Sequence, residues 1–257
     1  METLLKVEGI NVYYGAIHAI KDISFQVNQG EIVTLIGANG AGKTTTLQTV
    51  SGLLRSKTGS ILFDGQDINT VSADKLVGRG LAQVPEGRRV FLQMSVEENL
   101  EMGAYLHKKP TREELKDIFT RFPRLQERRD QVAGTLSGGE QQLVLIARAL
   151  AQNARTIIMD EPTSALDYGN TVRVLSTVRQ LAREGMSIVQ STHQPDQAFL
   201  YADQTLVIND GRVHAFGNPK DVITKELVST IYDVDVEVNS LYGDKVRVCV
   251  PVREIER

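Results

Sequence analysis

Residues 37–44 constrain this chain more than any other segment. They read G-x-x-x-x-G-K-T, follow the apolar run 31–36 and precede the helix-compatible run 45–50. A buried strand would then deliver a glycine-rich turn that opens a helix, whose free backbone N–H groups face the turn. These N–H groups and the positive helix end form a seat for a di- or triphosphate. The pattern predicts that Lys43 reaches the β- and γ-phosphates and that the Thr44 hydroxyl holds Mg²⁺, rather than a plain turn between strand and helix.

Length and composition limit the class of protein. The chain has 257 residues, 41% hydrophobic and 24% charged, as in an ordinary globular protein with one large domain or two lobes. Its net charge of −3 does not favour a nucleic-acid partner. The single cysteine, Cys249, excludes an internal disulfide framework, and its alternating surroundings favour a packed strand thiol. Because no stretch approaches the roughly 20 apolar residues of a membrane span and Met1 begins no signal sequence, we expect a cytoplasmic protein that reaches membranes only through a partner.

Hydrophobic periodicity predicts a mixed α/β chain. Strands are expected in the runs 4–7, 17–20, 23–27, 31–36, 60–63, 81–85, 156–159, 187–192, 204–208 and 211–215. Residues 88–155 have helical spacing and dense charge instead, including helices expected at 112–118, capped by Thr111, and at 143–151, which is typical of a helical subdomain inserted into an α/β core. A short helix near 220–232 is expected before a terminal β-hairpin.

Two side chains near predicted strand ends are candidate ligand contacts. Tyr14 lies at the turn before Gly15, where its ring is either an amphipathic packing group or a platform for a purine base. Gln83 lies within the run 81–85, near the end of the expected strand, where its amide carbonyl is either a surface group or a contact for a metal or a water.

The segment 136–141, Leu-Ser-Gly-Gly-Glu-Gln, opens an apolar-periodic helix and is a second candidate anion seat. The chain thus has two candidate anion seats but only one apparent nucleotide requirement. This is explained if the second seat binds a nucleotide that is held by another copy of the chain.

Polar residues follow two further buried runs. Asp160 and Glu161 come directly after the run 156–159, at the strand end where open α/β sheets bind ligands. Asp160 is predicted to hold Mg²⁺ through water and Glu161 to polarise an attacking water, the alternative being a strand that ends in an acidic turn. His193, after the run 187–192, is either structural or a contact for the γ-phosphate or the water.

Together these motifs resemble the ATP-binding subunits of ABC transporters. The phosphate loop, the Leu-Ser-Gly-Gly-Glu signature, the strand followed by Asp-Glu-Pro, the Ser-Ala-Leu-Asp turn and His193 occur once each, in that family's order, along almost the whole chain. The resemblance implies an α/β fold: a P-loop NTPase core, with a RecA-like sheet plus an antiparallel β-subdomain, and an inserted helical subdomain. It implies the division 1–87 (β-subdomain and phosphate-loop part of the core), 88–155 (helical subdomain with the signature), 156–232 (rest of the core) and 233–257 (β-hairpin tail).

The resemblance also implies a site shared by two copies packed head to tail around two ATP–Mg²⁺. The nucleotide is bound by Tyr14, which stacks on the adenine, and by Asn39, Gly40, Ala41, Gly42, Lys43, Thr44 and Thr45. The metal is held by Thr44, Gln83 and Asp160. The catalytic residues are Glu161 as general base, His193 as γ-phosphate clamp and Gln83 as γ-phosphate sensor. The opposite copy contributes Ser137, Gly138, Gly139 and Asp167. The implied reaction is phosphoryl transfer to water without a covalent intermediate.

Within this family, the two parts of the chain resemble different relatives. Up to about residue 139, the stretches 13–19 and 84–91 resemble the ATPases of branched-chain amino-acid importers. From about residue 141, the stretches 159–170 and 191–195 resemble the ATPases of iron-siderophore, haem or cobalamin importers. The chain is therefore either a natural outlier or a chimera joined near the signature.

The resemblance implies partners as well. In this family the groove for a transporter's coupling helix lies beside Gln83 and the helical subdomain, within the amino-acid-like part. This implies a subunit on the cytoplasmic face of the cell membrane, bound to transmembrane permease subunits of an amino-acid importer, to a second ATPase subunit and indirectly to a solute-binding protein. The alternatives are an iron-siderophore, haem or cobalamin importer, a soluble ABC ATPase without a transport role, or a regulatory module without turnover; the last would lack Glu161 or the signature, and both are present.

Overall fold

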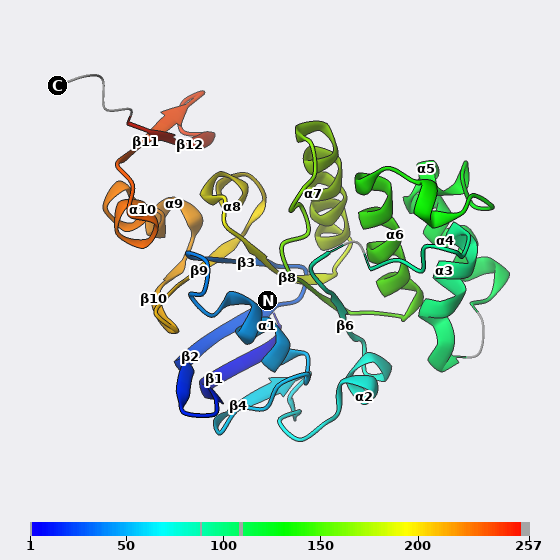
Figure 1. Ribbon diagram of the computed structural model, residues 1–257, viewed down its shortest axis with the longest axis horizontal. Coiled ribbons are helices and arrows are strands. Elements are labelled where there is room, and N and C mark those ends of the chain that lie inside the picture. The colour runs from blue at the N-terminus through cyan, green and yellow to red at the C-terminus, as the bar shows by residue number, and fades with distance from the viewer. Residues whose placement is uncertain (1, 88, 108–109, 253–257) are drawn as a thin grey trace.

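The larger of two main β-sheets forms the centre of the structure, a computed structural model that describes residues 2–87, 89–107 and 110–252 (Figure 1). Its strand order is β10-β9-β3-β8-β7-β6. The strands are β3 (Ile32–Ile36), β6 (Leu81–Val84), β7 (Thr156–Met159), β8 (Ser187–Thr192), β9 (Gln204–Asn209) and β10 (Arg212–Gly217). Neighbours are parallel, except that β10 pairs antiparallel with β9. Every residue of β3, β7 and β8 is buried, as expected of parallel strands covered on both faces.

The second sheet is antiparallel and packs against the first. Its order is β2-β1-β4-β5, with β1 (Thr3–Tyr14), β2 (Ile17–Asn28), β4 (Thr58–Phe63) and β5 (Gln66–Asp67). Apolar residues of β1 and β2 form one core with Val33 and Leu35 of β3. A main-chain hydrogen bond of 2.7 Å from Lys21 N to Gly211 O also joins the sheets. The turn between β1 and β2 is thereby held beside the loop that follows β3.

The helices divide into a group at the sheet edge and a group around the core. Beyond β6 lie α3 (Val96–Gly103), the 3₁₀ turn η1 (Ala104–His107), α4 (Arg112–Arg121), α5 (Pro123–Gln126), the 3₁₀ turn η2 (Ala133–Thr135) and α6 (Gly138–Ala151) (Figure 1). The others are α1 (Lys43–Val50), α2 (Ala73–Gly78), α7 (Tyr168–Arg183), α8 (Pro195–Tyr201), α9 (Pro219–Val222) and α10 (Lys225–Tyr232). The expected helical region is present, and its boundaries as a subdomain stay predictions.

Three helices of this region begin with the same reciprocal cap. The side chains of the N-cap residues Ser95, Thr111 and Ser137 each accept a hydrogen bond from the backbone N–H three residues on. The glutamate at that position accepts one in return from the N-cap N–H. The predicted cap at Thr111 is confirmed. The helix expected from residue 143 begins earlier, at Gly138, because the Ser137 cap already satisfies its first N–H groups.

The C-terminal region contains one helix more than expected. The segment near 220–232 divides into α9 and α10, because the Thr224 hydroxyl caps a new helix by accepting a hydrogen bond from Leu227 N at 3.2 Å. The predicted hairpin is confirmed as β11 (Val236–Leu241) and β12 (Val246–Pro251). Cys249 N donates to Asp196 Oδ1 of α8 at 2.7 Å. Burial raises the pKa of the Cys249 thiol to about 11, as expected of a packed strand thiol.

Some predicted features fall outside the described residues. These are the predicted boundary at Arg88 and residues 253–257 of the predicted tail. Within the described ranges, no helix combines the length and the apolar character that a membrane crossing requires.

Gly103 allows α3 to pack closely on α6, and alanine there should destabilise the protein. A Cβ at this position would come within 2.5 Å of Arg148 O. We expect Gly103→Ala to lower the free energy of unfolding by about 1–3 kcal/mol, measured by urea denaturation. The matched control is Gly78→Ala, also at the last residue of a helix, where the nearest atom would lie 3.9 Å away. Equal unfolding midpoints for the two variants would contradict the close packing of α3 on α6.

Candidate active site

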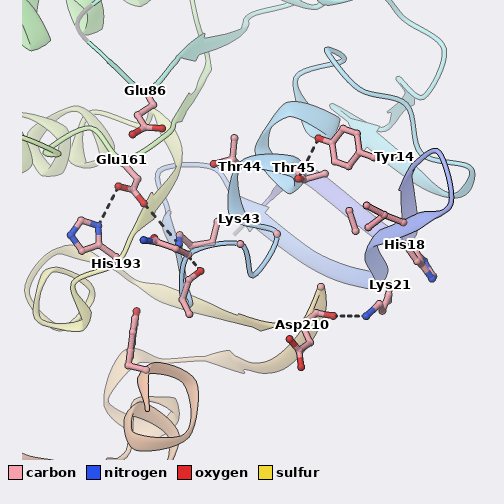
Figure 2. A pocket seen from close by; sticks show the side chains of 18 residues that line it. Tyr14, His18, Lys21, Lys43, Thr44, Thr45, Glu86, Glu161, His193 and Asp210 are labelled. Atoms are coloured by element: carbon pink, nitrogen blue, oxygen red, sulfur yellow. Dashed lines mark hydrogen bonds and ion pairs between the residues drawn. The ribbon is translucent and has the colours of Figure 1, made fainter. Parts of the chain in front are cut away.

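A cavity of about 920 Å³ opens at the carboxyl end of β3. Its walls come from the loop after β3, from the β1–β2 hairpin and from the segments after β7 and β8 (Figure 2). The predicted site residues that line it are Tyr14, Asn39, Gly40, Gly42, Lys43, Thr44, Thr45, Glu161 and His193. The cavity therefore lies at the edge where open α/β sheets bind their ligands.

The loop between β3 and α1 leaves the start of α1 open. Its N-cap is Gly42, with a φ of 110°, and within the described residues no side chain caps the helix. Within the described residues, the first turn of α1 contains no aspartate or glutamate. A Cβ on Gly37 would meet Ile208 O at 2.2 Å, so only glycine allows the loop to run this close to β9. The unsatisfied N–H groups and the positive helix end together fit the phosphate groups of a nucleotide.

Lys43 is a buried cation held by main-chain oxygens. Its side chain is 5% exposed. The ammonium group donates to Gly37 O at 2.8 Å and to Ala38 O at 3.2 Å, and lies 3.9 Å from Glu161 Oε1. Burial lowers the pKa of Lys43, and the nearby Glu161 carboxylate partly opposes this shift. A phosphate group in the cavity would favour the charged form of this lysine, because its negative charge acts in the same way as that of Glu161.

Thr44, which lines the cavity, is hydrogen-bonded to the buried Asp160. The buried Asp160 Oδ1 accepts hydrogen bonds from Thr44 Oγ1 at 3.2 Å and from Ser191 Oγ at 2.6 Å. Hydroxyl and carboxylate oxygens are ligands that Mg²⁺ prefers. Within the described residues, no three His, Cys, Asp or Glu side chains form a metal-binding group. This small oxygen set fits Mg²⁺, which keeps several waters and binds substrate phosphates alongside one or two protein groups.

Glu161 and His193 face each other at the cavity wall. Glu161 has a φ of 45°, in the left-handed region that such residues rarely adopt, and its N–H donates to Ser191 Oγ at 2.9 Å. Its Oε2 lies 3.2 Å from His193 Nδ1, on the side away from Lys43 (Figure 2). One carboxylate thus lies between a cation and a histidine, where it can accept a proton from a water beside a phosphate.

Tyr14 is exposed at the cavity mouth. Its hydroxyl lies 3.4 Å from Thr45 Oγ1, so the ring stands at the rim beside the phosphate loop (Figure 2). The neighbouring Tyr13 is engaged elsewhere, because its ring stacks on His18 with centroids 4.1 Å apart. Tyr14 is therefore the tyrosine of the pair that is placed to stack on a base.

The structure does not bring all predicted site residues together. In the part of the chain that it describes, the cavity lining does not include Ala41, Gln83, Asp160, Ser137, Gly138, Gly139 or Asp167. Both Ala41, which lies between Gly40 and Gly42 in the chain, and Asp160, which accepts a hydrogen bond from Thr44, are buried next to residues of the lining. Gln83 is half-buried in β6, paired with Ile158 of β7.

The signature residues form a separate cluster with the start of α7. Ser137 Oγ donates to Glu140 Oε2 at 2.8 Å, within its own helix cap. A Cβ on Gly139 would meet Asn170 Cγ at 2.5 Å, and Asn170 N donates to Asp167 Oδ1 at 2.8 Å. Asp167 is thus the N-cap of α7, and the start of α7 packs directly on Gly139.

Sequence reasoning missed several residues at the site, including Lys21 and Asp210 of the cavity lining and the three described next. Glu86 lines the cavity after β6, and its place just past a strand end could have indicated it. Ser191 bonds both Asp160 and Glu161 N, and it lies in the strand that leads to His193. Tyr232 of α10 also lines the cavity, and burial raises the pKa of its hydroxyl to about 12. No local pattern could have indicated Tyr232, because only long-range packing places α10 there.

Comparison with known proteins gives consistent matches along the chain. A family model described as ABC transporter matches residues 20–164. The high-affinity branched-chain amino acid transport ATP-binding protein BraG of Pseudomonas aeruginosa is 38% identical over 230 residues, 89% of this chain and 99% of that protein. The cobalamin import ATP-binding protein BtuD of Halobacterium salinarum is 35% identical over 244 residues, 92% of this chain and 60% of that protein.

Solved structures confirm the predicted fold class. The ADP conformation of MJ1267, an ATP-binding cassette of an ABC transporter, has a TM-score of 0.83 and 28% identity, covering 91% of this chain and 99% of that one. A chain from an inward-facing transporter described as of the metal-chelate type has a TM-score of 0.84 and 30% identity, covering 99% of both chains.

Ser191 should contribute more to stability than a neighbouring buried serine. Ser191→Ala removes the bonds to Asp160 and to Glu161 N, whereas Ser187→Ala, on the same strand, removes one bond from Ser187 Oγ to Asn28 O at 2.9 Å. We expect losses of unfolding free energy of about 2–3 kcal/mol for Ser191→Ala and about 1 kcal/mol for Ser187→Ala, measured by urea denaturation. A smaller loss for Ser191→Ala would contradict its role as the bridge between the two carboxylate residues.

Proposed function

Because this chain belongs to the ABC transporter family of ATP-binding proteins, which hydrolyse ATP, we propose that it powers an importer of branched-chain amino acids. The similarity to BraG carries the proposal, because it extends over 99% of that protein at 38% identity. BraG is described as a branched-chain amino acid transport protein. The stretches 13–19 and 84–91 support the same assignment.

ATP binds in the cavity beside the phosphate loop. Its phosphates lie on the open start of α1, and the Tyr14 ring stacks on the adenine. Lys43 turns from the Gly37 carbonyl to the β- and γ-phosphates, which is favourable because its charge is buried against neutral carbonyl oxygens. Asn39, Gly40, Ala41, Gly42 and Thr45 complete the phosphate cradle.

Glu161 activates the water that hydrolyses ATP. It accepts a proton from the water, whose oxygen bonds to the γ-phosphorus while the bond to the β–γ bridging oxygen breaks, giving ADP and inorganic phosphate. His193, 3.2 Å from Glu161, contacts the γ-phosphate. Thr44, Gln83 and Asp160 are the proposed ligands of Mg²⁺, which, when bound, neutralises charge on the β- and γ-phosphates.

A second copy of the chain completes each site. Ser137, Gly138 and Gly139 of one copy meet the γ-phosphate held by the other, with Asp167 at the same interface. The separation of the signature cluster from the cavity within one chain supports this arrangement. On closure the Ser137 hydroxyl exchanges Glu140 for a phosphate oxygen, while Arg128, 3.1 Å from Glu140, remains to pair that carboxylate.

A permease docks on the helical region and holds the chain at the cytoplasmic face of the membrane. Large apolar side chains are exposed in the stretch 91–106, namely Phe91, Leu92, Met102, Tyr105 and Leu106. Their exposure within one short stretch of the chain supports a docking surface there. It lies in the part of the chain that resembles amino-acid importers, and a solute-binding protein is linked through the permease.

An importer of iron-siderophore, haem or cobalamin is the second candidate. The solved chain that covers 99% of this one comes from a transporter described as of the metal-chelate type. The BtuD relative, described as a cobalamin import protein, matches 92% of this chain. The stretches 159–170 and 191–195 agree with this candidate, and the origin of the chain as an outlier or a chimera stays a prediction.

Glu161→Gln should separate ATP binding from hydrolysis. The amide keeps the size of the side chain but cannot accept the proton, so we expect a loss of hydrolysis of roughly 100-fold or more, with ATP affinity retained. Steady-state phosphate release and equilibrium ATP binding measure the two effects, and Glu113→Gln on the exposed face of α4 is the control. Undiminished hydrolysis would refute the general-base assignment.

Pull-down with detergent-solubilised permeases of each importer class should distinguish the two candidates. We expect capture by the amino-acid-type permease and its loss in Tyr105→Glu, because burying the introduced carboxylate against the permease costs free energy. The control is Tyr242→Glu, since the two tyrosines are 78% and 80% exposed and Tyr242 lies in the tail. Capture by the siderophore-type permease alone would overturn the amino-acid assignment.

A further inference from the structure

Gln197, in the first turn of α8, joins the segments that carry Glu161 and His193. Its side chain is 5% exposed. Its Nε2 donates to Thr163 Oγ1 at 3.1 Å, and its Oε1 accepts from Thr192 Oγ1 at 3.0 Å. Thr163 lies two residues after Glu161, and Thr192 directly precedes His193. One buried amide is thus bonded to both catalytic segments.

The same amide holds the residue that follows His193. Gln197 Nε2 donates a second bond to Gln194 Oε1 at 2.7 Å, and Gln194 N donates to Thr192 Oγ1 at 3.2 Å. Both chain neighbours of His193 are therefore tied to Gln197. His193 itself is about half exposed, so these bonds supply much of the constraint on its position.

Hydrogen bonding, rather than volume, distinguishes glutamine at this position. A methionine would fill the same space in the helix without burying an amide. A buried amide is tolerated only when its donors and acceptor are satisfied, and Gln197 meets this condition entirely with partners from the two catalytic segments and from its own turn. The amide therefore fixes the distance between the segment after β7 and the segment after β8.

We propose that Gln197 is a positioning residue for ATP hydrolysis, which holds Glu161 and His193 in the mutual geometry required for turnover without contacting ATP. The proposal rests on the catalytic roles given above to Glu161 and His193. A misplacement of about 1 Å at a reacting group can cost roughly 100-fold in rate, so loss of these bonds should be visible in kcat.

Gln197→Met tests the proposal in the full chain, because it keeps the volume and removes the bonds. We expect kcat for ATP hydrolysis to fall roughly tenfold, while the dissociation constant for ATP changes by less than about twofold. The matched control is Gln180→Met, an exposed glutamine of α7, which should leave both values unchanged. An unchanged kcat in Gln197→Met would overturn the proposal. A loss of ATP affinity equal to the loss of kcat/KM would also overturn it, because that result would indicate a merely structural role for Gln197.

A second pair of variants tests the same bonds from the other side. Thr192→Val removes the hydroxyl that donates a hydrogen bond to Gln197 Oε1, whereas Thr192→Ser keeps this donor, so we expect kcat to fall in the first variant and to be retained in the second. The double variant Gln197→Met with Thr163→Val should cost less than the two single changes combined, because each single change already breaks the same link between Gln197 and Thr163. Equal kcat in the two Thr192 variants would refute the link. Failure of Glu161→Gln to reduce hydrolysis would refute the general-base role instead, so the two failures are distinguishable.

Discussion

The open start of α1 is the constraint on which the rest of the site depends. A helix end without a side-chain cap has N–H groups that need acceptors, and the loop places the buried Lys43 directly beside them. This concentration of positive charge is stabilised in the protein by main-chain carbonyls and by Glu161. The parallel strands serve this arrangement, because their carboxyl ends bring Asp160, Glu161 and His193 to the same edge.

Residues that follow buried strands were predictable from sequence. The apolar runs of β3, β7 and β8 are fully buried, so the polar residues just past them had to meet at one edge of the sheet. The Thr111 cap was also predictable from local sequence, because its partner Glu114 is only three residues away. The C-terminal hairpin followed from alternation alone.

Features that depend on packing across the chain were not predictable in this way. Tyr232 reaches the cavity because α10 docks there through long-range packing, which no short sequence pattern predicts. The contact between Gly139 and Asn170 joins two helix starts from different parts of the sequence. The signature turn and the start of α7, which Asp167 caps, are consequently packed against each other.

The anchor of the C-terminal hairpin on α8 has a consequence for how this tail can vary. The bond to Asp196 is donated by the main-chain N–H of residue 249, and every amino acid except proline supplies that donor. The hairpin can therefore change its surface side chains freely and stay attached to the helix that follows His193.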